Sequence, residues 1–318
     1  MDPAPGRSSR RSCVTIVVTG SSGFIGSHLC DALLAGGEGL VGIDRVASTK
    51  VPTIETDLAV PSGEALDALA GAEVVWHLAA RPGIRDRRPD IEAQRHRDNV
   101  VATARVLNAV PRQTPLVVTS SSSVYGGSRH GGTERPSLET DPLRPRGGYA
   151  RSKVAMERLC LRRAERGSRV AIARPFTVAG EGQRPDMAIA TWIESIRAGR
   201  TAALLGSPTR TRDVADVRDV VRGLIAMADR GVSGVVNLGS GCAHSLADIV
   251  RAVSEALNLP ASVEIVPART EEVPATRADT TRCEELLGVT FGTDLRTLVM
   301  RQVEASATAV HSRLQEVG

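Results

Sequence analysis

Two residues near the middle of this 318-residue chain, Tyr149 and Lys153, have the types and the spacing to do chemistry. The chain contains only two tyrosines and two lysines, and one of each stands four residues apart in a predicted helix over 149–166. Positions four apart share a helix face, and a lysine cation one turn away favours the phenolate form of tyrosine. A phenolate can take a proton from a substrate hydroxyl, although an isolated pair of this kind is more commonly an ordinary surface pair.

Ser121 is the third candidate for catalysis. It lies in a run of four serines, 120–123, directly after an apolar segment that predicts a strand over 116–119. A hydroxyl at this place can hydrogen-bond the substrate oxygen that loses its proton to Tyr149, and so position it. Ser121, Tyr149 and Lys153 therefore form the predicted catalytic group.

A glycine-rich turn near the N-terminus predicts a site for phosphate groups. The β-branched run 14–19 leads into three glycines, each separated from the next by two residues, and an apolar helical pattern follows. Such a unit brings the backbone close to a diphosphate and points a helix N-terminus at its negative charge. Glycines alone are a weak signal, because any sharp strand-to-helix turn favours them. The cofactor contacts expected here are Gly20, Gly23, Phe24, Ile25 and Gly26.

Asp44 indicates which kind of phosphate ligand this turn binds. It ends a second apolar segment, 40–44, that follows the first predicted helix. A carboxylate at this position accepts hydrogen bonds from both hydroxyls of an adenosine ribose and repels a 2′-phosphate. The sequence therefore favours NAD over NADP as the cofactor, although the positive charge of Arg45 works against that preference.

Further strands and helices alternate along the chain, which predicts an α/β fold with a doubly wound parallel sheet. Ligands of such sheets bind at the carboxyl ends of the strands. His77 lies within a predicted strand, 73–80, and is expected to be a core residue rather than a base. The remaining residues expected to contact the cofactor are Asp57, Leu58, Leu78, Ala79, Ala80, Asn99, Tyr149, Lys153 and Pro175.

The composition argues against several other classes of protein. A net charge of +4, carried by dispersed arginines with 2% aromatic residues, favours a solvated basic surface over a nucleic-acid interface. Five cysteines without a CxxC pair argue against a disulfide framework and against a metal site. Residues 1–12 predict a disordered tail rather than a signal peptide, and no segment has the length of a membrane span. We therefore expect a soluble, cytoplasmic protein.

Together, these motifs resemble the NAD-dependent sugar epimerase/dehydratase family of the extended short-chain dehydrogenases/reductases. The resemblance covers nearly all of the chain after the tail and rests on the glycine turn, the segments 77–80 and 121–126, and the Tyr149/Lys153 pair. It implies bound NAD, a nucleotide-sugar substrate, and usually a homodimer joined through a helix bundle. It also implies a Rossmann-like NAD domain over 13–174 with a returning segment, about 213–241, and a smaller C-terminal α/β substrate domain over 175–212 and 242–318.

The same resemblance implies where a nucleotide sugar would bind. Arg212 resembles an arginine that contacts the diphosphate, and in the segment 269–274 the arginine resembles a second diphosphate contact while the acid would accept the ribose hydroxyls. The chain departs from the family at Glu272, where many members have Asp, and at Thr177, where many have Asn. The implied substrate contacts are Arg85, Ser122, Ser123, Thr177, Arg184, Arg212, Arg269 and Glu272.

The residues after Ser121 distinguish the reactions of the family. Dehydratases of the family carry Asp-Glu directly after the catalytic hydroxyl, and decarboxylases carry a glutamate at the second position, whereas this chain has Ser122 and Ser123. A serine hydroxyl is neither an acid nor a base at neutral pH. The sequence therefore favours 4-epimerisation, in which C4 is oxidised, the 4-keto sugar rotates, and hydride returns to the other face.

The segments 83–85 and 182–188 look most like those of UDP-glucuronate 4-epimerases, so UDP-glucuronate is the expected substrate. Our hypothesis is that Ser122, Ser123 and Thr177 hold its carboxylate as neutral donors, with Arg184 or Arg85 nearby. In the rival interpretation the arginines contact only phosphate and the substrate is a neutral UDP-hexose, such as UDP-glucose or UDP-N-acetylglucosamine. The motifs are also compatible with a reductase that releases its cofactor after each turnover and with a non-catalytic NAD-binding protein.

Overall fold

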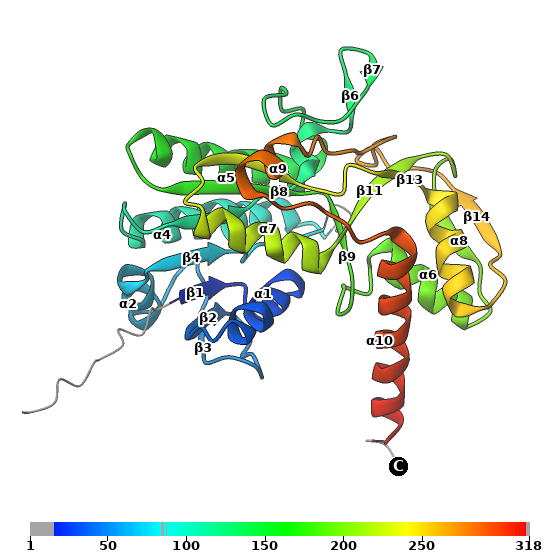
Figure 1. Cartoon of the computed structure of the whole chain (residues 1–318), viewed down its shortest axis with the longest axis horizontal. Coiled ribbons are helices and arrows are strands. Elements are labelled where there is room, and N and C mark those ends of the chain that lie inside the picture. The colour runs from blue at the N-terminus through cyan, green and yellow to red at the C-terminus, as the bar shows by residue number, and fades with distance from the viewer. Residues whose placement is uncertain (1–15, 84–85, 87, 316–318) are drawn as a thin grey trace, which may run out of the picture.

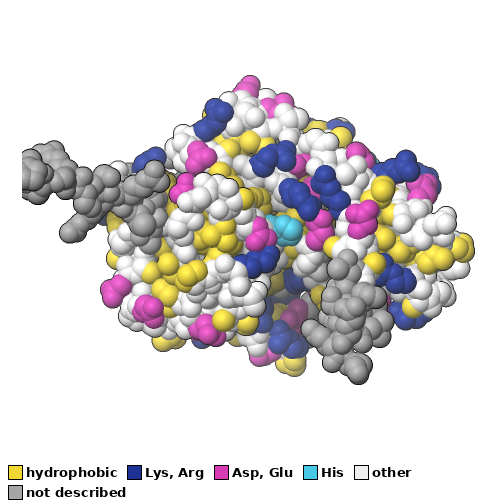
Figure 2. Space-filling view, turned by 60° about the horizontal axis from the view of Figure 1, so that its bottom comes forward, with side chains coloured by type: hydrophobic (Ala, Val, Ile, Leu, Met, Phe, Trp, Pro, Cys, Tyr) yellow, Lys and Arg dark blue, Asp and Glu magenta, His cyan; other side chains and the backbone are white. Residues whose placement is uncertain are grey.

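The computed structural model describes residues 16–83, 86 and 88–315, with side chains up to residue 307. The predicted tail, 1–12, and Arg85 lie outside the described residues. Among the described residues, no helix combines the length and the apolar character that crossing a bilayer requires. Figure 2 shows basic and acidic side chains interspersed over the face that it presents, so this face carries no continuous field of one sign.

A parallel sheet of seven strands forms the centre of the described fold (Figure 1). Its order is β12-β8-β5-β4-β1-β2-β3, and every neighbouring pair is parallel. The strand order reverses between β1 and β4, which is where sheets of this kind bind ligands. This topology confirms the predicted doubly wound sheet. The strands are β1 (Ile16–Thr19), β2 (Leu40–Asp44), β3 (Thr53–Glu55), β4 (Val74–His77), β5 (Leu116–Thr119), β8 (Val170–Pro175) and β12 (Gly234–Leu238).

Helices cover both faces of this sheet and bury its apolar side chains. One core packs the strands against α1, α7 and α9, and a second core packs them against α2, α4 and α5. The helical elements of this part are α1 (Phe24–Ala35), α2 (Gly63–Gly71), α3 (Ile91–Arg95), the π-helix η1 (His96–Val101), α4 (Ala102–Ala109), the 3-10 turn η2 (Ser122–Tyr125), α5 (Gly147–Glu165), α7 (Val217–Asp229) and α9 (Thr281–Leu287).

A smaller part, built mainly from C-terminal segments, lies beside the main sheet (Figure 1). Within it β10 pairs with β14, β13-β11-β9 form a mixed sheet, and α6, α8 and α10 share one apolar core with β10 and β11. This smaller α/β part confirms the predicted fold class. Its elements are β9 (Thr177–Ala179), α6 (Ala188–Arg197), β10 (Ala202–Leu205), β11 (Thr211–Asp216), β13 (Ala243–Ser245), α8 (Leu246–Leu257), β14 (Val263–Val266) and α10 (Leu295–Gln315).

The segment 127–148 is partly structured, whereas its composition suggests a long surface loop. Ser137 forms a β-bridge with Ala278, and the Ser128 hydroxyl accepts a hydrogen bond from the backbone N–H of Arg277 at 2.6 Å. These contacts tie the segment to the C-terminal part of the chain, which local composition does not reveal. The segment also contains a short hairpin of β6 (Arg129–His130) and β7 (Thr133–Glu134).

A buried ion pair fixes helix α5 on the sheet. Arg174 of β8 donates hydrogen bonds from Nε and Nη2 to the Glu157 carboxylate at 2.9 and 2.7 Å, and both side chains are at most 3% exposed. Arg174 also donates to the Tyr125 hydroxyl at 2.8 Å and lies 4.9 Å from the centre of its ring. Because α5 carries Tyr149 and Lys153, this contact sets the position of both candidate catalytic residues.

Replacing Glu157 with glutamine should lower the free energy of unfolding by about 3–5 kcal/mol, because Arg174 would stay buried without its carboxylate. Urea unfolding followed by circular dichroism measures this change. Arg251→Ala is the matched control, since its ion pair with Asp248 is exposed and should contribute less than about 1 kcal/mol. Equal losses in the two variants would contradict the role given to the buried pair.

Candidate active site

A cavity of about 1170 Å³ lies at the carboxyl ends of the strands, between the main sheet and the smaller part. Its wall contains every described residue of the predicted catalytic, cofactor and substrate sets except Asn99. The structure thus brings together side chains from segments more than two hundred residues apart in the sequence, from Gly20 to Glu272. The part of the chain that the structure describes holds no group of three His, Cys, Asp or Glu side chains placed to bind a metal ion.

Close packing explains the glycines of the first turn. A Cβ on Gly26 would lie 2.0 Å from the carbonyl oxygen of Gly20, and a Cβ on Gly20 would lie 2.6 Å from the backbone nitrogen of Ala79. Gly23 lines the cavity as the N-cap of α1, and it makes no side-chain cap. The first backbone N–H groups of α1, at Phe24 and Ile25, are therefore placed to receive a diphosphate.

The carboxylate of Asp44 favours NAD and the positive charge of Arg45 favours NADP, and the contacts of the two side chains decide between these effects. The Asp44 carboxylate accepts hydrogen bonds from the backbone N–H of Ser22 at 3.0 Å and of Arg45 at 2.7 Å. The Arg45 guanidinium donates to Asp98 at 2.5 and 3.0 Å and to Asp57 at 3.1 Å. A guanidinium that already has two carboxylate partners is a poor site for a 2′-phosphate, so the observed pairing favours NAD.

Asp57 and Leu58 line the cavity beside Asp44, but the Asp57 side chain is occupied. Burial alone would raise the pKa of Asp57, and hydrogen bonds from Arg97, the backbone of Ala59 and Arg45 bring it down to about 2. The carboxylate is thus charged and paired at neutral pH. An adenine ring in contact with Asp57 would therefore compete with Arg97 and Arg45 for its carboxylate.

Asn99 lies behind the cavity wall rather than in it. Its side chain is fully buried, accepts a hydrogen bond from the backbone N–H of Arg81 at 2.6 Å, and donates to the Ser152 hydroxyl at 2.9 Å. Both ends of the amide are therefore used within the protein. These contacts tie Asn99 to the segment 78–83, whose residues Leu78 and Ala79 line the cavity, and a direct contact of Asn99 with the cofactor stays a prediction.

His77 is a core residue, as the sequence predicts. Its Nδ1 lies 2.7 Å from the Thr19 hydroxyl and its Nε2 lies 2.9 Å from the Thr103 hydroxyl. Burial, with a smaller contribution from the Lys153 cation, lowers the pKa of His77 to about 3. The imidazole therefore stays neutral and hydrogen-bonded within the protein, away from any proton transfer.

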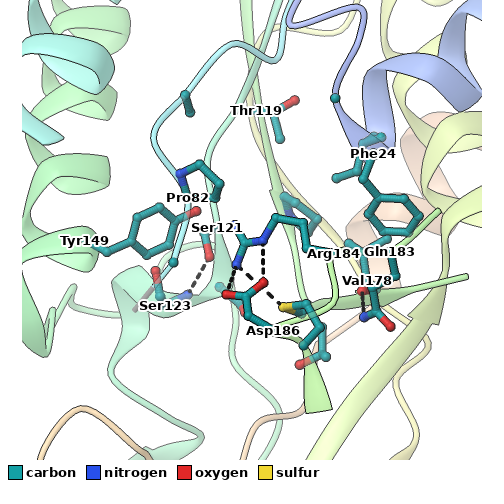
Figure 3. Close-up of a pocket in the computed structure, with 18 of the residues that line it drawn as sticks. Phe24, Pro82, Thr119, Ser121, Ser123, Tyr149, Val178, Gln183, Arg184 and Asp186 are labelled. Carbon is teal, nitrogen blue, oxygen red and sulfur yellow. Dashed lines mark hydrogen bonds and ion pairs between the residues drawn. The ribbon is translucent and has the colours of Figure 1, made fainter. Parts of the chain in front are cut away.

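Tyr149 and Ser121 point toward one another in the cavity (Figure 3). Burial raises the pKa of the Tyr149 phenol, while the Ser121 hydrogen bond and the cations Arg184 and Arg95 act in the opposite direction. Because burial dominates, the phenol is protonated at neutral pH in the protein alone. Arg95 was not found from the sequence; it ends α3, directly before the π-helix η1 that carries Asn99.

Lys153 is buried, and its ammonium donates a hydrogen bond to the carbonyl oxygen of Thr119 at 2.8 Å. Burial lowers the pKa of Lys153 to about 8, and the Glu157 carboxylate opposes that effect. The sequence predicts that this cation acts directly on the Tyr149 phenol. In the structure Lys153 is anchored at the end of β5, and its action on the phenol stays a prediction; Arg184 and Arg95 lower the pKa of the phenol.

The serine run forms the wall beside Tyr149. The Ser121 hydroxyl accepts a hydrogen bond from the backbone N–H of Ser123 at 3.2 Å. The Ser123 hydroxyl is itself buried and has no hydrogen-bond partner within the described residues. A buried hydroxyl without a partner costs about 1–3 kcal/mol, so a ligand oxygen here would be stabilising. Ser122 and Thr177 line the same cavity.

Arginines on the substrate side of the cavity are paired with carboxylates. Arg184 donates from Nε and Nη2 to Asp186 at 2.9 Å each (Figure 3), and Arg212 donates to Glu272 at 3.2 Å. Arg269 also lines the cavity. Asp186 was not predicted as a site residue, although its position two residues after Arg184 is compatible with such a pair.

An apolar part of the wall was also missed by the sequence analysis. It comes from α6, β10 and α8, whose apolar residues recur at helical or strand spacing and so predict a core. Nothing in that pattern distinguishes the residues that face the cavity from those that pack against other elements. The lining residues are Ile189, Trp192, Leu205, Leu246 and Ile249.

Asp44→Ala should weaken NAD binding by about tenfold, because the variant loses hydrogen bonds from the ribose hydroxyls to a charged acceptor. NADP binding should fall less, since the repulsion of its 2′-phosphate is also removed. Titration of protein fluorescence with each dinucleotide measures both affinities. Asp31→Ala, which removes an exposed carboxylate of α1 that pairs with Lys50, is the control and should leave both unchanged. Equal losses for NAD and NADP would contradict the assignment of Asp44.

Comparison of the chain with known proteins shows the family to which it belongs. The model of the NAD dependent epimerase/dehydratase family matches residues 16–239. The UDP-glucose 4-epimerase of Mycolicibacterium smegmatis is 32% identical over 290 residues, which cover 86% of this chain and 92% of that protein. Other curated relatives are UDP-glucuronic acid decarboxylases and a dTDP-glucose 4,6-dehydratase.

Two solved structures share the fold over nearly their whole length. MoeE5 in complex with UDP-glucuronic acid and NAD is 36% identical, with a TM-score of 0.83, and the match covers 93% of this chain and 99% of that chain. The UDP-glucuronic acid 4-epimerase of Bacillus cereus, in complex with UDP-glucuronic acid and NAD, is 26% identical, with a TM-score of 0.86 and the same coverage. The cofactor is NAD, and this chain belongs to the NAD dependent epimerase/dehydratase family.

Proposed function

We propose that this protein converts UDP-glucuronate to UDP-galacturonate by NAD-dependent epimerisation at C4. The observation that carries this proposal is the wall formed by Ser121, Ser122 and Ser123 beside Tyr149. It places hydroxyl groups where the dehydratases and decarboxylases of the family carry carboxyl groups, so elimination lacks its acid and base. The retained Tyr149, Lys153 and glycine turn argue against a non-catalytic NAD-binding protein.

In the proposed reaction Tyr149 accepts the proton of the substrate 4-hydroxyl, and Ser121 orients that oxygen through a hydrogen bond. NAD bound at the glycine turn would supply the acceptor for the hydride of C4, and its positive ring would favour the phenolate of Tyr149. Arg184 and Arg95 add to the same effect on the phenol. After the 4-keto sugar has rotated, Tyr149 gives the proton back, so one residue serves both half-reactions.

We attribute the choice of a uronate to neutral hydrogen-bond donors. The Ser123 hydroxyl has no partner among the described residues, and Ser122 and Thr177 lie in the same wall. The charge of Arg184 is largely balanced by Asp186. A 4-keto uronate is a β-keto acid that loses carbon dioxide easily, so the site must hold its carboxylate. The complex of the Bacillus cereus UDP-glucuronic acid 4-epimerase with UDP-glucuronic acid supports this choice, whereas MoeE5 forms complexes with both UDP-glucuronic acid and UDP-glucose and does not discriminate between them.

The remaining substrate contacts and the assembly are part of the same proposal. Arg212 and Arg269 would bind the diphosphate and Glu272 the ribose hydroxyls of the UDP group, as the resemblance to the family implies. The NAD domain would cover 13–174 and about 213–241, and the substrate domain 175–212 and 242–318. The active form is proposed to be a homodimer.

The first test is to incubate the purified protein, without added cofactor, with UDP-glucuronate and in parallel with UDP-glucose, and to separate the products by anion exchange. We expect UDP-galacturonate from the first tube alone. Tyr149→Phe should bind UDP-glucuronate as well as the wild type but lose on the order of 10³-fold in turnover, the size of general-base catalysis.

Each other outcome excludes a part of the proposal. Product from UDP-glucose alone would make the protein a UDP-hexose 4-epimerase, and loss of carbon dioxide from UDP-glucuronate would make it a decarboxylase. Activity retained by Tyr149→Phe would exclude Tyr149 as the base. No product in either tube would contradict the proposed substrates.

A second test concerns the carboxylate. Changing both Ser122 and Ser123 to alanine should weaken the binding of UDP-glucuronate by about 10- to 100-fold, the range expected for lost hydrogen bonds to a charged group. Binding of UDP-glucose, which lacks the carboxylate, should change by less than about threefold. Calorimetric titration of the double variant and the wild type with each sugar measures this difference. Equal losses for the two sugars would contradict the proposed carboxylate contacts.

A further inference from the structure

A second pocket, of about 250 Å³, lies between the C-terminal ends of α4 and α5. The two helices are neighbours in the fold (Figure 1). The pocket shares no lining residue with the active-site cavity. Two of its residues, Arg112 and Ser168, shortly precede β5 and β8, so it lies at the amino ends of the strands. The active-site cavity is at the opposite edge of the sheet, at the carboxyl ends.

The charge of this pocket is entirely positive. Four arginines line it, and no aspartate or glutamate does; the arginines are Arg112, Arg162, Arg163 and Arg166. Among the residues that the structure describes, none of the four forms an ion pair with a carboxylate. Burial and the nearby charge of Arg112 lower the pKa of Arg163. The arginines of the active site differ in this respect, since several of them are paired with acids.

Two residues that line this pocket, Arg163 and Ser168, each carry a buried donor without an acceptor. The Ser168 side chain is 6% exposed, and its hydroxyl has no hydrogen-bond partner among the described residues. The Nε of Arg163 likewise lacks a partner there, whereas its two terminal nitrogens donate to the carbonyl oxygens of Leu107 and Val110. These last contacts occupy the carbonyls at the end of α4, which would otherwise repel an anion.

We propose that this pocket binds a phosphate group, either of free inorganic phosphate or of a small phosphate ester. Planar guanidinium groups match the geometry and charge of phosphate oxygens. Arg163 is already fixed by α4, while Arg112, Arg162 and Arg166 are exposed and border the pocket. Ser168 supplies a neutral donor at its buried side. The four arginines could also only compensate the partial negative charge at the C-terminal ends of α4 and α5. That role would not account for the unpaired hydroxyl of Ser168.

The test uses the whole protein saturated with UDP, so that the diphosphate contacts of the main cavity are occupied. Calorimetric titration with inorganic phosphate at constant ionic strength should show one saturable site per chain. At ten times the dissociation constant the midpoint of thermal unfolding should rise by on the order of 2 °C. Arg112→Ala combined with Arg166→Ala should abolish this site, and Ser168→Ala should weaken it by about three- to tenfold.

Arg158→Ala is the matched control, because Arg158 is an exposed arginine of α5 outside the pocket. Phosphate also stabilises proteins without binding, so only the difference between the wild type and the pocket variants counts. Glucose 1-phosphate in place of phosphate distinguishes the sources: tighter binding of the ester identifies an esterified ligand, and weaker binding identifies the free ion. Equal phosphate binding by the wild type and the pocket variants, or an equal loss in Arg158→Ala, would overturn the proposal.

Discussion

The active site depends most on the buried ion pair between Glu157 and Arg174. In the protein interior, either charge without its partner would cost several kcal/mol. Both charges are paired only when α5 has one rotation about its axis and one position along β8. Glu157 lies one helical turn beyond Lys153 and two turns beyond Tyr149, on the same face of α5. The pair therefore selects the orientation of the helix that presents the phenol to Ser121.

The same arginine also fixes the wall that faces the phenol. Arg174 donates to the hydroxyl of Tyr125, which donates in turn to Asn237 of β12 at 2.7 Å. Tyr125 ends the turn that contains the serine run, so one buried network holds the tyrosine helix, the serines and two strands. Burial raises the pKa of Tyr125 strongly, and its hydroxyl is used by protein partners. The two tyrosines of the chain thus have different roles: Tyr125 is a structural donor, and Tyr149 is open to the cavity.

The sequence predicted those parts of the site that depend on local backbone requirements. The glycine turn must be glycine because atoms of Gly20 and Ala79 occupy the space of a Cβ, and the residue pattern over 149–166 predicts the helix that carries Tyr149 and Lys153. Contacts made across the fold could not be predicted in this way. Arg45 is paired with Asp98 because the fold brings the residue after β2 next to η1, and the Asn99 side chain is bonded to the backbone of Arg81 behind the cavity wall. The charge of Arg95 acts on the pKa of Tyr149 because α3 packs beside α5.

The pairing of charges gives the two proposed anion sites different properties. A nucleotide sugar that enters the main cavity meets Arg184 and Arg212 already bound to Asp186 and Glu272, so each new contact replaces part of an existing one. The net gain in affinity from such an exchange is small, because a hydrogen bond to a carboxylate is lost for each one made to the ligand. A weak contact between Arg184 and the sugar is compatible with the proposed epimerisation, since the 4-keto intermediate must leave one orientation and adopt another before hydride returns. Around Ser168 no carboxylate lines the pocket, so an anion there would keep the full attraction of the guanidinium groups.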